Sequence, residues 1–436
     1  MADRVVGVLG AGYVGLTTAA CLAHLGHRVV CVDSCESKVA NLRQSRLLIS
    51  EPGLDSLVRD GLAAGRLRFS TDLDALAPAG EIVLCLPTPM AEDGTADLGT
   101  VEQVVPALAG IAGDSAVLAV KSTVPVGTSA RIAERLGRTD VAVVSNPEFL
   151  REGHAVDDFL RPDRIVIGAS DPAAADRVAA LYPGVPAPVV RTDPASAELA
   201  KYASNAYLAM RLSYVNTLAE LCERVGADIG SVTGIMGLDS RIGTAFLEPG
   251  PGWGGSCLPK DTSALVHTAT TAGLRSDLLR ATITANVEQR NRIVRKVRAA
   301  VTGHPAGSLE GARIGVLGLT FKSGTDDLRD SPALAVVADL ANGGATVTAH
   351  DPAVPDAPMP GVHLVDDPTL VAKDANAIVV LTEWPLFRTL DWAGMAELAH
   401  GDVVVDARNL LDPDDLRAAG FTCRGLGRPV DREAVA

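Results

Sequence analysis

The sequence predicts an α/β protein with two doubly wound parallel-sheet domains joined by a helical central region. Three observations predict this class: a strand–glycine turn–helix–strand pattern over residues 4–33, long helical stretches over residues 194–298, and a second α/β pattern after a linker at residues 304–308. Each α/β pattern has the order of a Rossmann-like unit. We therefore expect three domains, at residues 1–193, 194–303 and 304–436.

The first α/β unit has the most regular pattern. Residues 4–10 contain a short apolar run that ends in glycine, residues 13–25 are rich in alanine and leucine, and the apolar run at residues 28–32 ends at Asp33. Strand candidates then alternate with helical segments, which implies a parallel sheet covered on both faces. These candidates lie at residues 81–86, 116–120, 141–144 and 164–167.

The central and C-terminal parts follow in order. Residues 197–224 contain few β-branched residues and no glycine or proline, so they predict one helix of about 40 Å. Part of the glycine and aspartate pattern of the first unit recurs in Gly315, Gly318 and Asp351. This indicates a duplication whose second copy has diverged. Strands are predicted there at residues 313–317, 345–349, 377–381 and 403–405.

Composition and charge exclude several classes of function. The 436 residues carry a net charge of −14, which argues against nucleic acid or an anionic membrane as the main partner. The seven cysteines include no CxxC pair and the eight histidines have no metal-ligand spacing, so we expect neither a disulfide framework nor a metal site. No run approaches ~18 apolar residues, and the N-terminus enters a strand directly. We expect a reduced, cytoplasmic protein without a membrane span.

A dinucleotide site is predicted at the first glycine turn. Gly10, Gly12 and Gly15 form a GxGxxG pattern that follows a strand and opens a helix, so that backbone N–H groups can meet a pyrophosphate. Asp33 ends the next strand, 18 residues after Gly15, and its carboxylate would accept hydrogen bonds from ribose hydroxyls and repel a 2′-phosphate. NAD is therefore favoured over NADP, although Lys38 lies close in sequence.

The second glycine pattern predicts a different ligand. It has no third glycine at the required offset, and Lys322 brings a cation to the place where a helix would begin. We therefore expect this domain to bind a ligand other than a dinucleotide, one that also carries phosphates.

A nucleophilic thiol is predicted at Cys257. It lies in the glycine-rich run at residues 252–261, with Lys260 and Asp261 just downstream. A nearby cation favours the thiolate, which is the nucleophilic form, and glycines let the backbone approach a substrate closely. The alternative is an ordinary buried cysteine.

Two further groups of polar residues could contribute to catalysis. Lys201 and Asn205 lie four residues apart on the predicted long helix and therefore share one face. Glu148 and Glu152 follow the end of a predicted strand, where ligands gather in open α/β sheets. The alternative for Lys201 and Asn205 is a solvated face, but the neighbouring positions are mostly Ala, Leu, Tyr and Met, so polar groups on this helix are few.

Ten ordered motifs resemble the UDP-glucose/GDP-mannose dehydrogenase family, over residues 5 to about 428. They include GAGYVG, KSTVPVG, SNPEFLREG and PGWGGSCLPKD, and they lie at residues 10–15, 51–54, 121–127, 145–153, 201–217, 239–243, 251–261, 318–332, 382–392 and 406–409. The resemblance implies a four-electron oxidation of the C6 alcohol of a nucleotide sugar to a carboxylate, with two NAD molecules used in turn.

The resemblance also implies catalytic roles. Cys257 would form a thiohemiacetal and then a thioester with the sugar carbon, while Lys201 and Asn205 would stabilise oxyanions. Asp261 resembles the acid that acts with water as base in the first oxidation. Glu148 resembles the general base for thioester hydrolysis, and Thr123 the hydroxyl that orders the water.

Binding residues follow from the same motif matches. The NAD set comprises Gly10, Gly12, Tyr13, Val14, Gly15, Asp33, Lys38, Thr88, Thr123, Glu152, Lys260 and Arg329. The substrate set comprises Glu148, Phe149, Leu150, Arg151, Glu152, Lys201, Asn205, Arg241, Phe246, Leu247, Glu248, Pro249, Gly250, Gly254, Phe321, Lys322 and Arg408. The family implies a homodimer built on the middle helices, with Arg241 reaching the neighbouring subunit's site.

The choice of substrate rests on fewer residues. Ser256 precedes Cys257, where relatives that act on N-acetyl-mannosamine substrates carry histidine, and this favours glucose. The resemblance therefore implies oxidation of UDP-glucose to UDP-glucuronate, although no residue distinguishes uridine from thymidine. The alternatives are the same chemistry on TDP-glucose, GDP-mannose or UDP-N-acetylmannosamine, a two-electron hydroxyacid dehydrogenase, and a non-catalytic nucleotide-sugar sensor.

Overall fold

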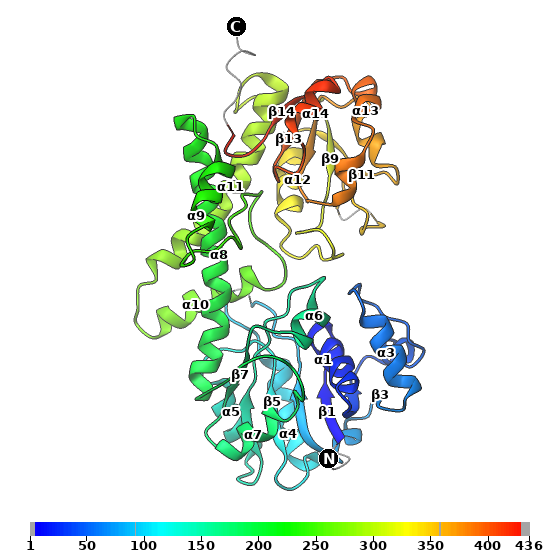
Figure 1. Ribbon diagram of the computed structural model, residues 1–436, viewed down its shortest axis with the longest axis vertical. Helices are drawn as coiled ribbons and strands as arrows, with labels where there is room; N and C mark the ends of the chain where they lie inside the picture. The colour runs from blue at the N-terminus through cyan, green and yellow to red at the C-terminus, as the bar shows by residue number, and fades with distance from the viewer. Residues whose placement is uncertain (1–4, 92, 357–358, 429–436) are drawn as a thin grey trace. The chain divides into compact units, whose positions relative to one another are not determined.

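The computed structural model describes residues 5–91, 93–356 and 359–428. The chain forms two compact units (Figure 1). The first comprises Met1–Ser204 and Ser263–Leu274, and the second comprises Asn205–Thr262 and Arg275–Ala436. The three domain boundaries that the sequence predicts stay a prediction.

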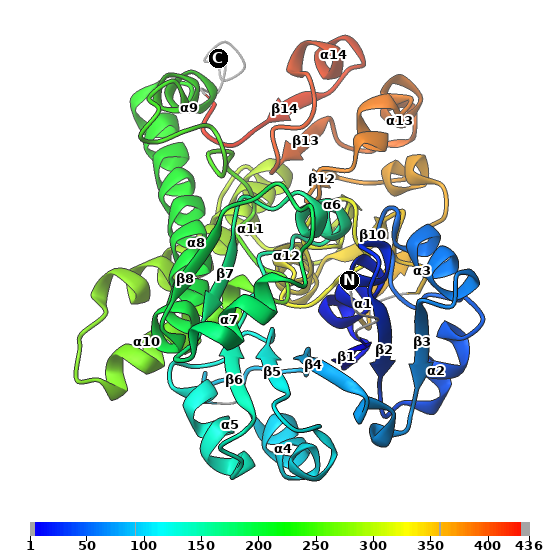
Figure 2. The same cartoon turned by 60° about the horizontal axis from the view of Figure 1, so that its bottom comes forward.

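An eight-stranded sheet forms the centre of the first unit, in the order β3-β2-β1-β4-β5-β6-β7-β8 (Figure 2). Its first six strands pair in parallel, in the order of a doubly wound dinucleotide-binding sheet. The strands are β1 (Val5–Leu9), β2 (Arg28–Val32), β3 (Leu67–Ser70), β4 (Ala79–Leu84), β5 (Val117–Val120), β6 (Ala142–Ser145), β7 (Ile165–Gly168) and β8 (Val189–Thr192).

Helices cover both faces of this sheet, which explains why its central strands are continuously apolar. One face packs against α1 (Tyr13–His24), α2 (Glu36–Leu42), α3 (Leu54–Ala63), α6 (Ala155–Leu160) and α7 (Pro172–Ala179). The other face packs against the 3-10 helix η1 (Leu73–Leu76), α4 (Gly99–Ile111) and α5 (Thr128–Leu136).

The second unit contains a six-stranded sheet in the order β11-β10-β9-β12-β13-β14, and all its pairs are parallel. The strands are β9 (Arg313–Leu317), β10 (Thr346–His350), β11 (Val362–Leu364), β12 (Ala377–Val380), β13 (Val403–Asp406) and β14 (Thr422–Arg424). Packed on one face are α11 (Asp277–Thr302) and α12 (Pro332–Asn342). On the other face are η2 (Pro368–Ala372), η3 (Pro385–Thr389), α13 (Trp392–Leu398) and α14 (Pro413–Ala418).

The central sequence is helical, as predicted. Helix α8 (Pro194–Val225) has 32 residues and begins with a proline, which suits a first helical turn that needs no N–H donor. It runs from the first unit into the second. Helices α9 (Ile229–Gly237) and α10 (Leu258–Thr271) follow it, ahead of α11. Within the described ranges, no helix is long and apolar enough to cross a membrane.

The two predicted sheets are confirmed, with two differences. Strands β3, β8, β11 and β14 were not predicted from the sequence because they lie at sheet edges and mix polar with apolar residues, whereas the predicted four-residue strands are almost wholly apolar. The first sheet is also not wholly parallel, since β6 and β7 pair antiparallel through the single pair Ser145–Gly168. This short ladder is supplemented by the Asn146 side chain, which donates to the Val166 carbonyl at 2.9 Å.

Candidate active site

The first glycine turn has the geometry that a dinucleotide needs. Gly10 has a φ of +98°, and a Cβ there would lie 2.4 Å from the Cys85 carbonyl oxygen. A Cβ on Gly15 would lie 1.9 Å from the Gly10 carbonyl oxygen, so only glycine lets α1 pack this close to the turn. A Cβ on Gly12 would meet nothing within 4 Å, which leaves open space at the start of α1 for a pyrophosphate.

Asp33 lies directly after β2 and faces this turn. Its carboxylate accepts hydrogen bonds from the backbone N–H of Ala11 at 2.8 Å and of Cys35 at 3.0 Å, and from the Lys38 ammonium at 2.9 Å. Burial opposes ionisation, but the hydrogen bond from Lys38 and those from the backbone outweigh it and lower the pKa of Asp33. The group is therefore an anion at neutral pH, and an anionic oxygen is a strong acceptor for ribose hydroxyls.

Several predicted residues follow the carboxyl ends of neighbouring strands in the first sheet. Thr88 follows β4 and Thr123 follows β5, and the Thr88 hydroxyl donates to the Thr123 carbonyl at 2.8 Å. Glu148 follows β6 in the same way. Because these strands are parallel, their carboxyl ends share one edge of the sheet, so these residues lie along the same edge as Gly10 and Asp33.

Glu148 and Lys201 form a buried ion pair in the first unit. Their charged atoms are 3.0 Å apart, and the two side chains are 6% and 4% exposed. The other Glu148 oxygen accepts from the backbone N–H of Leu150 at 2.5 Å, and the Lys201 ammonium lies 5.2 Å from the Phe149 ring centre. The ion pair therefore holds the two predicted catalytic side chains against each other.

The second unit holds the predicted nucleophile and its neighbours. Cys257 directly precedes α10, and its carbonyl accepts from the backbone N–H of Asp261. The buried Asp261 carboxylate accepts from the Asn205 amide at 2.6 Å and pairs with Lys260 at 2.5 Å. Cys257 therefore lies at the N-terminus of a helix, where the helix dipole is partially positive. The Ser256 hydroxyl oxygen lies 3.5 Å from the Cys257 sulfur.

Other thiols in the protein have a different environment. Burial raises the pKa of Cys21 and of Cys85 to about 12, so both remain protonated at neutral pH. Cys257 differs from both because it is only partly buried and lies at a helix start. The alternative of an ordinary buried cysteine therefore describes Cys21 and Cys85 rather than Cys257.

Close packing explains the glycines before Cys257. A Cβ on Gly254 would lie 2.1 Å from the Asp330 carbonyl oxygen, and a Cβ on Gly255 would lie 2.8 Å from the Phe321 ring. The Gly255 N–H also donates to the Arg329 carbonyl at 3.1 Å. The thiol loop therefore lies directly against the segment that follows β9.

Three of the predicted substrate residues are brought together in the second unit. The Arg408 guanidinium donates to the Phe321 carbonyl at 2.9 Å and lies 3.1 Å from the position of a Cβ on Gly250. Asn216 and Gln289 hold Gly250 by hydrogen bonds to its backbone N–H and carbonyl. Gln289 was not identified from the sequence, because it acts from α11, about 40 residues along the chain.

The remaining predicted residues of the second unit vary in exposure. Leu247 and Pro249 are buried beside Gly250, Phe246 and Lys322 are half-buried, and Glu248 is exposed. The Arg241 side chain is 87% exposed and pairs with Asp239. The structure therefore leaves Arg241 on the surface, and its predicted reach into a neighbouring subunit stays a prediction.

Exposure also varies among the predicted residues of the first unit. Leu150 and Glu152 are half-buried, and Tyr13 and Val14 lie half-buried in the first turn of α1. Arg151 is exposed and pairs with Asp158.

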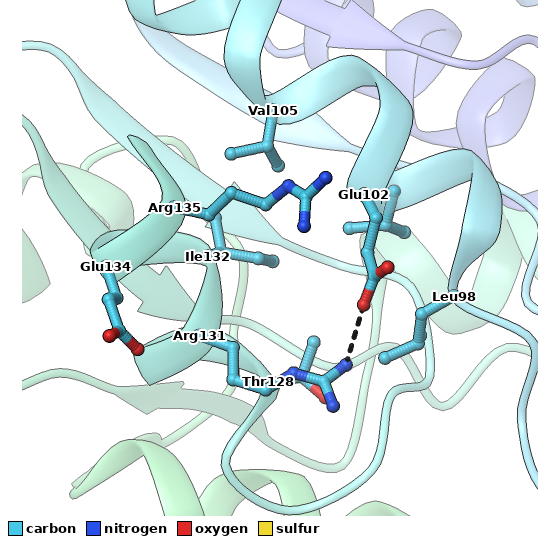
Figure 3. Close-up of a pocket in the computed structure, with 9 residues that line it drawn as sticks. Leu98, Glu102, Val105, Thr128, Arg131, Ile132, Glu134 and Arg135 are labelled. Atoms are coloured by element: carbon cyan, nitrogen blue, oxygen red, sulfur yellow. Dashed lines mark hydrogen bonds and ion pairs between the residues drawn. The ribbon is translucent and has the colours of Figure 1, made fainter. Parts of the chain in front are cut away.

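A pocket of about 390 Å³ lies elsewhere in the first unit, between α4 and α5. Figure 3 shows Arg131 and Glu102 joined by an ion pair across it, beside Arg135. None of the predicted site residues lines this pocket. It therefore provides no support for the catalytic assignments.

Comparison with known proteins agrees with this geometry. Models of the UDP-glucose/GDP-mannose dehydrogenase family match residues 4–185 as its NAD binding domain, 195–288 as its central domain and 315–413 as its UDP binding domain. The chain is 43% identical over 436 residues to a UDP-glucose 6-dehydrogenase of Rhizobium meliloti, covering 97% of this chain and 99% of that protein.

Solved structures show the same fold. A UDP-glucose dehydrogenase from Pyrobaculum islandicum matches with a TM-score of 0.89 and 38% identity over 98% of both chains. A UDP-D-ManNAc dehydrogenase from Pyrococcus horikoshii matches with a TM-score of 0.88 and 27% identity, over 98% of this chain and 99% of that one. The chain is an NAD-dependent oxidoreductase that belongs to the UDP-glucose/GDP-mannose dehydrogenase family.

Proposed function

We propose that the protein oxidises the C6 alcohol of UDP-glucose to the carboxylate of UDP-glucuronate. The observation that carries this proposal is the position of Cys257 directly before α10. In the first turn of that helix, Asp261 pairs with Lys260 and accepts a hydrogen bond from Asn205. A two-electron alcohol dehydrogenase has no need of such a thiol. Covalent capture of an aldehyde does need one, because it allows a second oxidation without release of the intermediate.

The first oxidation requires a base and support for the substrate oxygen. Asp261 would take the C6 hydroxyl proton through a water, and its hydrogen bond with Asn205 would hold it in place. NAD accepts a hydride in each of the two oxidations when it is bound. Lys201 and Asn205 lie one turn apart on α8, and their side chains would stabilise negative charge on the sugar oxygen.

The second half of the reaction uses the thiol and the Glu148–Lys201 pair. The Cys257 thiolate would add to the aldehyde carbon to give a thiohemiacetal, and loss of the second hydride leaves a thioester. Glu148 would then take a proton from a water that Thr123 orders, and attack of that water breaks the carbon–sulfur bond. The products are the carboxylate and the free thiol.

The sugar and the nucleotide are assigned by similarity. The relatives named above support UDP-glucose, and Ser256 before Cys257 is consistent with glucose. Because the UDP-D-ManNAc dehydrogenase has nearly the same TM-score, the fold alone does not discriminate between these sugars. We assign the residues from 304 onward to the nucleotide part of the substrate, residues 1–193 to NAD and residues 194–303 to the dimer.

Assembly as a homodimer and location in the cytoplasm belong to the same proposal. Large exposed apolar side chains are frequent on the central helices, including Tyr207, Tyr214 and Leu221 on α8. These three lie at seven-residue intervals, so they form one stripe that suits a partner helix. Arg241 would then reach the partner's site, and a supply of NAD and nucleotide sugar fits the cytoplasm.

Cofactor stoichiometry and one variant test the activity. We expect two NADH formed for each UDP-glucose consumed, and we expect Cys257→Ala to lower acid formation by at least about 1000-fold. NADH absorbance and chromatography of the product measure both. Cys423→Ser, which removes a thiol whose pKa is raised to about 12 by burial, should leave turnover unchanged.

Two results would contradict the proposal. One NADH per substrate, with a hydroxyacid as the preferred substrate, would identify a two-electron dehydrogenase. Acid formation by Cys257→Ala at the parental rate would exclude the covalent step. A panel of UDP-, TDP- and GDP-sugars, compared by kcat/KM, would then assign the nucleotide.

A further inference from the structure

Glu51 is a buried carboxylate to which neither the sequence patterns nor the proposed reaction assigns a function. It is 7% exposed and lies in the segment before α3, in the first unit. Its carboxylate accepts hydrogen bonds from the Tyr13 hydroxyl and from the backbone N–H groups of Gly153 at 2.7 Å and Ala155 at 2.7 Å. The sequence offered one signal for it, namely an acid at the start of the EPGL motif.

The three donors come from two functional segments. Tyr13 is the first residue of α1 and directly follows Gly12, at the open end of the glycine turn. Gly153 lies near the end of the loop that follows β6 and carries Glu148 and Glu152, and Ala155 is the first residue of α6, directly after that loop. Helix α1 packs against both α3 and α6 (Figure 1). The Glu51 carboxylate therefore joins the start of α1, at the predicted NAD site, to the end of the loop that carries Glu148, the proposed base.

Both ends of that loop are thus held by carboxylates. Glu148 anchors the beginning through Lys201 and the Leu150 N–H, while Glu51 anchors the end. The Gly153 N–H also lies 3.0 Å from the Tyr13 hydroxyl oxygen, so the phenol and the carboxylate share this donor. Gly153 has a φ of +78°, a conformation that glycine adopts without strain.

The electrostatics favour a fixed arrangement. Burial and the hydrogen bond to Glu51 raise the pKa of Tyr13, so its phenol stays protonated and remains a donor. A carboxylate can accept at both oxygens, whereas a glutamine presents one N–H₂ group that cannot. Replacement of Glu51 by glutamine therefore leaves at least one buried donor without an acceptor.

We propose that Glu51 is a positioning residue that couples the NAD site to the loop carrying Glu148 and Glu152. It acts through Tyr13 on one side and through Gly153 and Ala155 on the other. The proposal rests on the function proposed above. It implies that loss of Glu51 weakens NAD use and slows turnover together, because both segments lose the same anchor.

Kinetics of Glu51→Gln test this inference in the full-length enzyme. We expect KM for NAD to rise about fivefold or more and kcat to fall about tenfold. The Kd for UDP, measured by calorimetry, should stay within about twofold, since the matched UDP binding domain begins at residue 315. Glu102→Gln is the matched control: it removes an exposed glutamate of the same unit and should change none of these constants.

A double-mutant cycle with Tyr13→Phe separates coupling from general destabilisation. Tyr13→Phe should raise KM for NAD by a smaller factor, and the double variant should be no worse than Glu51→Gln alone, because both changes break one connection. The inference would be overturned if KM for NAD and kcat of Glu51→Gln stayed within about twofold of the parent. It would also be overturned if the effects of the two single changes on KM multiplied in the double variant. If Glu51→Gln does not fold, unchanged NAD kinetics in Tyr13→Phe would overturn it.

The parental enzyme separates this test from that of the proposed function. Failure of the parent to oxidise UDP-glucose would reject the function. In that case NADH fluorescence titration, which needs no turnover, would still compare NADH affinity between the parent and Glu51→Gln. An unchanged affinity would reject the coupling.

Discussion

Two aspartates occupy corresponding places in the two sheets but have different neighbours. Asp33 follows β2 and accepts hydrogen bonds from two backbone N–H groups and from Lys38. Asp351 follows β10, is 5% exposed, and accepts from Leu319, Thr320 and the Trp384 indole. Asp351 is buried and its oxygens accept from five protein donors, whereas Asp33 accepts from three and is only partly buried, so Asp351 cannot serve a ribose as Asp33 would. This explains why the second glycine pattern does not make a second dinucleotide site.

Substitution of Asp33 tests its assignment. We expect Asp33→Ala to raise KM for NAD about tenfold, because a charge-assisted acceptor is lost. KM for NADP should fall, because Lys38 is then released to meet a 2′-phosphate. The ratio of kcat/KM for the two cofactors measures the change. Asp55→Ala, which removes an exposed partner of Arg59, should leave that ratio unchanged, and an unchanged ratio in Asp33→Ala would contradict the assignment.

At the scale of elements, the thiol loop depends on its fit against the segment after β9. Gly255→Ala would place a methyl group 2.8 Å from the Phe321 ring at a φ of +80°. We expect kcat to fall at least about tenfold while the fold is retained, since displacement of the nucleophile by about 1 Å is costly. Gly110→Ala, near the C-terminal end of α4 with nothing within 4 Å, should retain full activity. Parental activity in Gly255→Ala would show that the close fit has no role in catalysis.

The C-terminal part of α8 is held by a charge cluster centred on Glu223. Its carboxylate pairs with Arg292 at 2.7 Å and Lys296 at 2.9 Å on α11 and accepts from the Gly427 N–H at 2.8 Å. Burial opposes ionisation, but Lys296, Arg292 and the Gly427 N–H together lower the pKa of Glu223. A carboxyl whose folded pKa is lowered stabilises the fold above its unfolded pKa, about 4.3, and loses this contribution as pH falls.

Unfolding measurements test this cluster. We expect Glu223→Gln to lower the free energy of unfolding by about 2 kcal/mol at pH 7.5, because two cations lose their carboxylate. The difference from the parent should narrow as pH falls below about 4.5. Glu288→Gln removes an exposed partner of Arg295 on the same helix and should change stability by less than about 0.5 kcal/mol. If the difference in free energy of unfolding between Glu223→Gln and the parent did not depend on pH, the stabilisation by the charged Glu223 carboxylate would be contradicted.

At the scale of the whole molecule, several large apolar side chains of the second unit are exposed. Tyr207, Tyr214, Leu221 and Val225 on α8 are each more than half exposed. Leu238, just beyond α9, is 86% exposed. Such a grouping on one unit is typical of an interface rather than of free surface.

Light scattering tests the proposed dimer. The parent should have twice the mass of one chain, and the double variant Tyr214→Glu, Leu221→Glu should shift toward a monomer, because charges would be buried at the interface. Leu398→Glu, at an exposed position of α13, should remain a dimer. A parent with the mass of one chain would reject the dimer and, with it, the assignment of Arg241.

Much of the molecule was predictable from the sequence because its signals are local. Glycine spacing and apolar runs predicted both sheets, and the absence of glycine and proline over residues 197–224 predicted α8 within three residues at its N-terminal end. The edge strands were not predictable, since they mix polar with apolar residues over only three or four positions and so lack the apolar run of the central strands. The antiparallel pairing of β6 with β7 consists of one residue pair, and no local sequence pattern predicts it.

The sequence by itself determined the class of chemistry: a glycine turn with a following acid for NAD, and a thiol with adjacent charges for a carbonyl. Only the tertiary structure decided which of these groups meet. It paired Glu148 with Lys201 and Asn205 with Asp261, and it gave Glu51 three donors from segments about 40 and 100 residues away. Residue types and spacing specify what a side chain can do. Its partners, burial and charge balance depend on contacts between segments far apart in the chain, and these exist only in the folded protein.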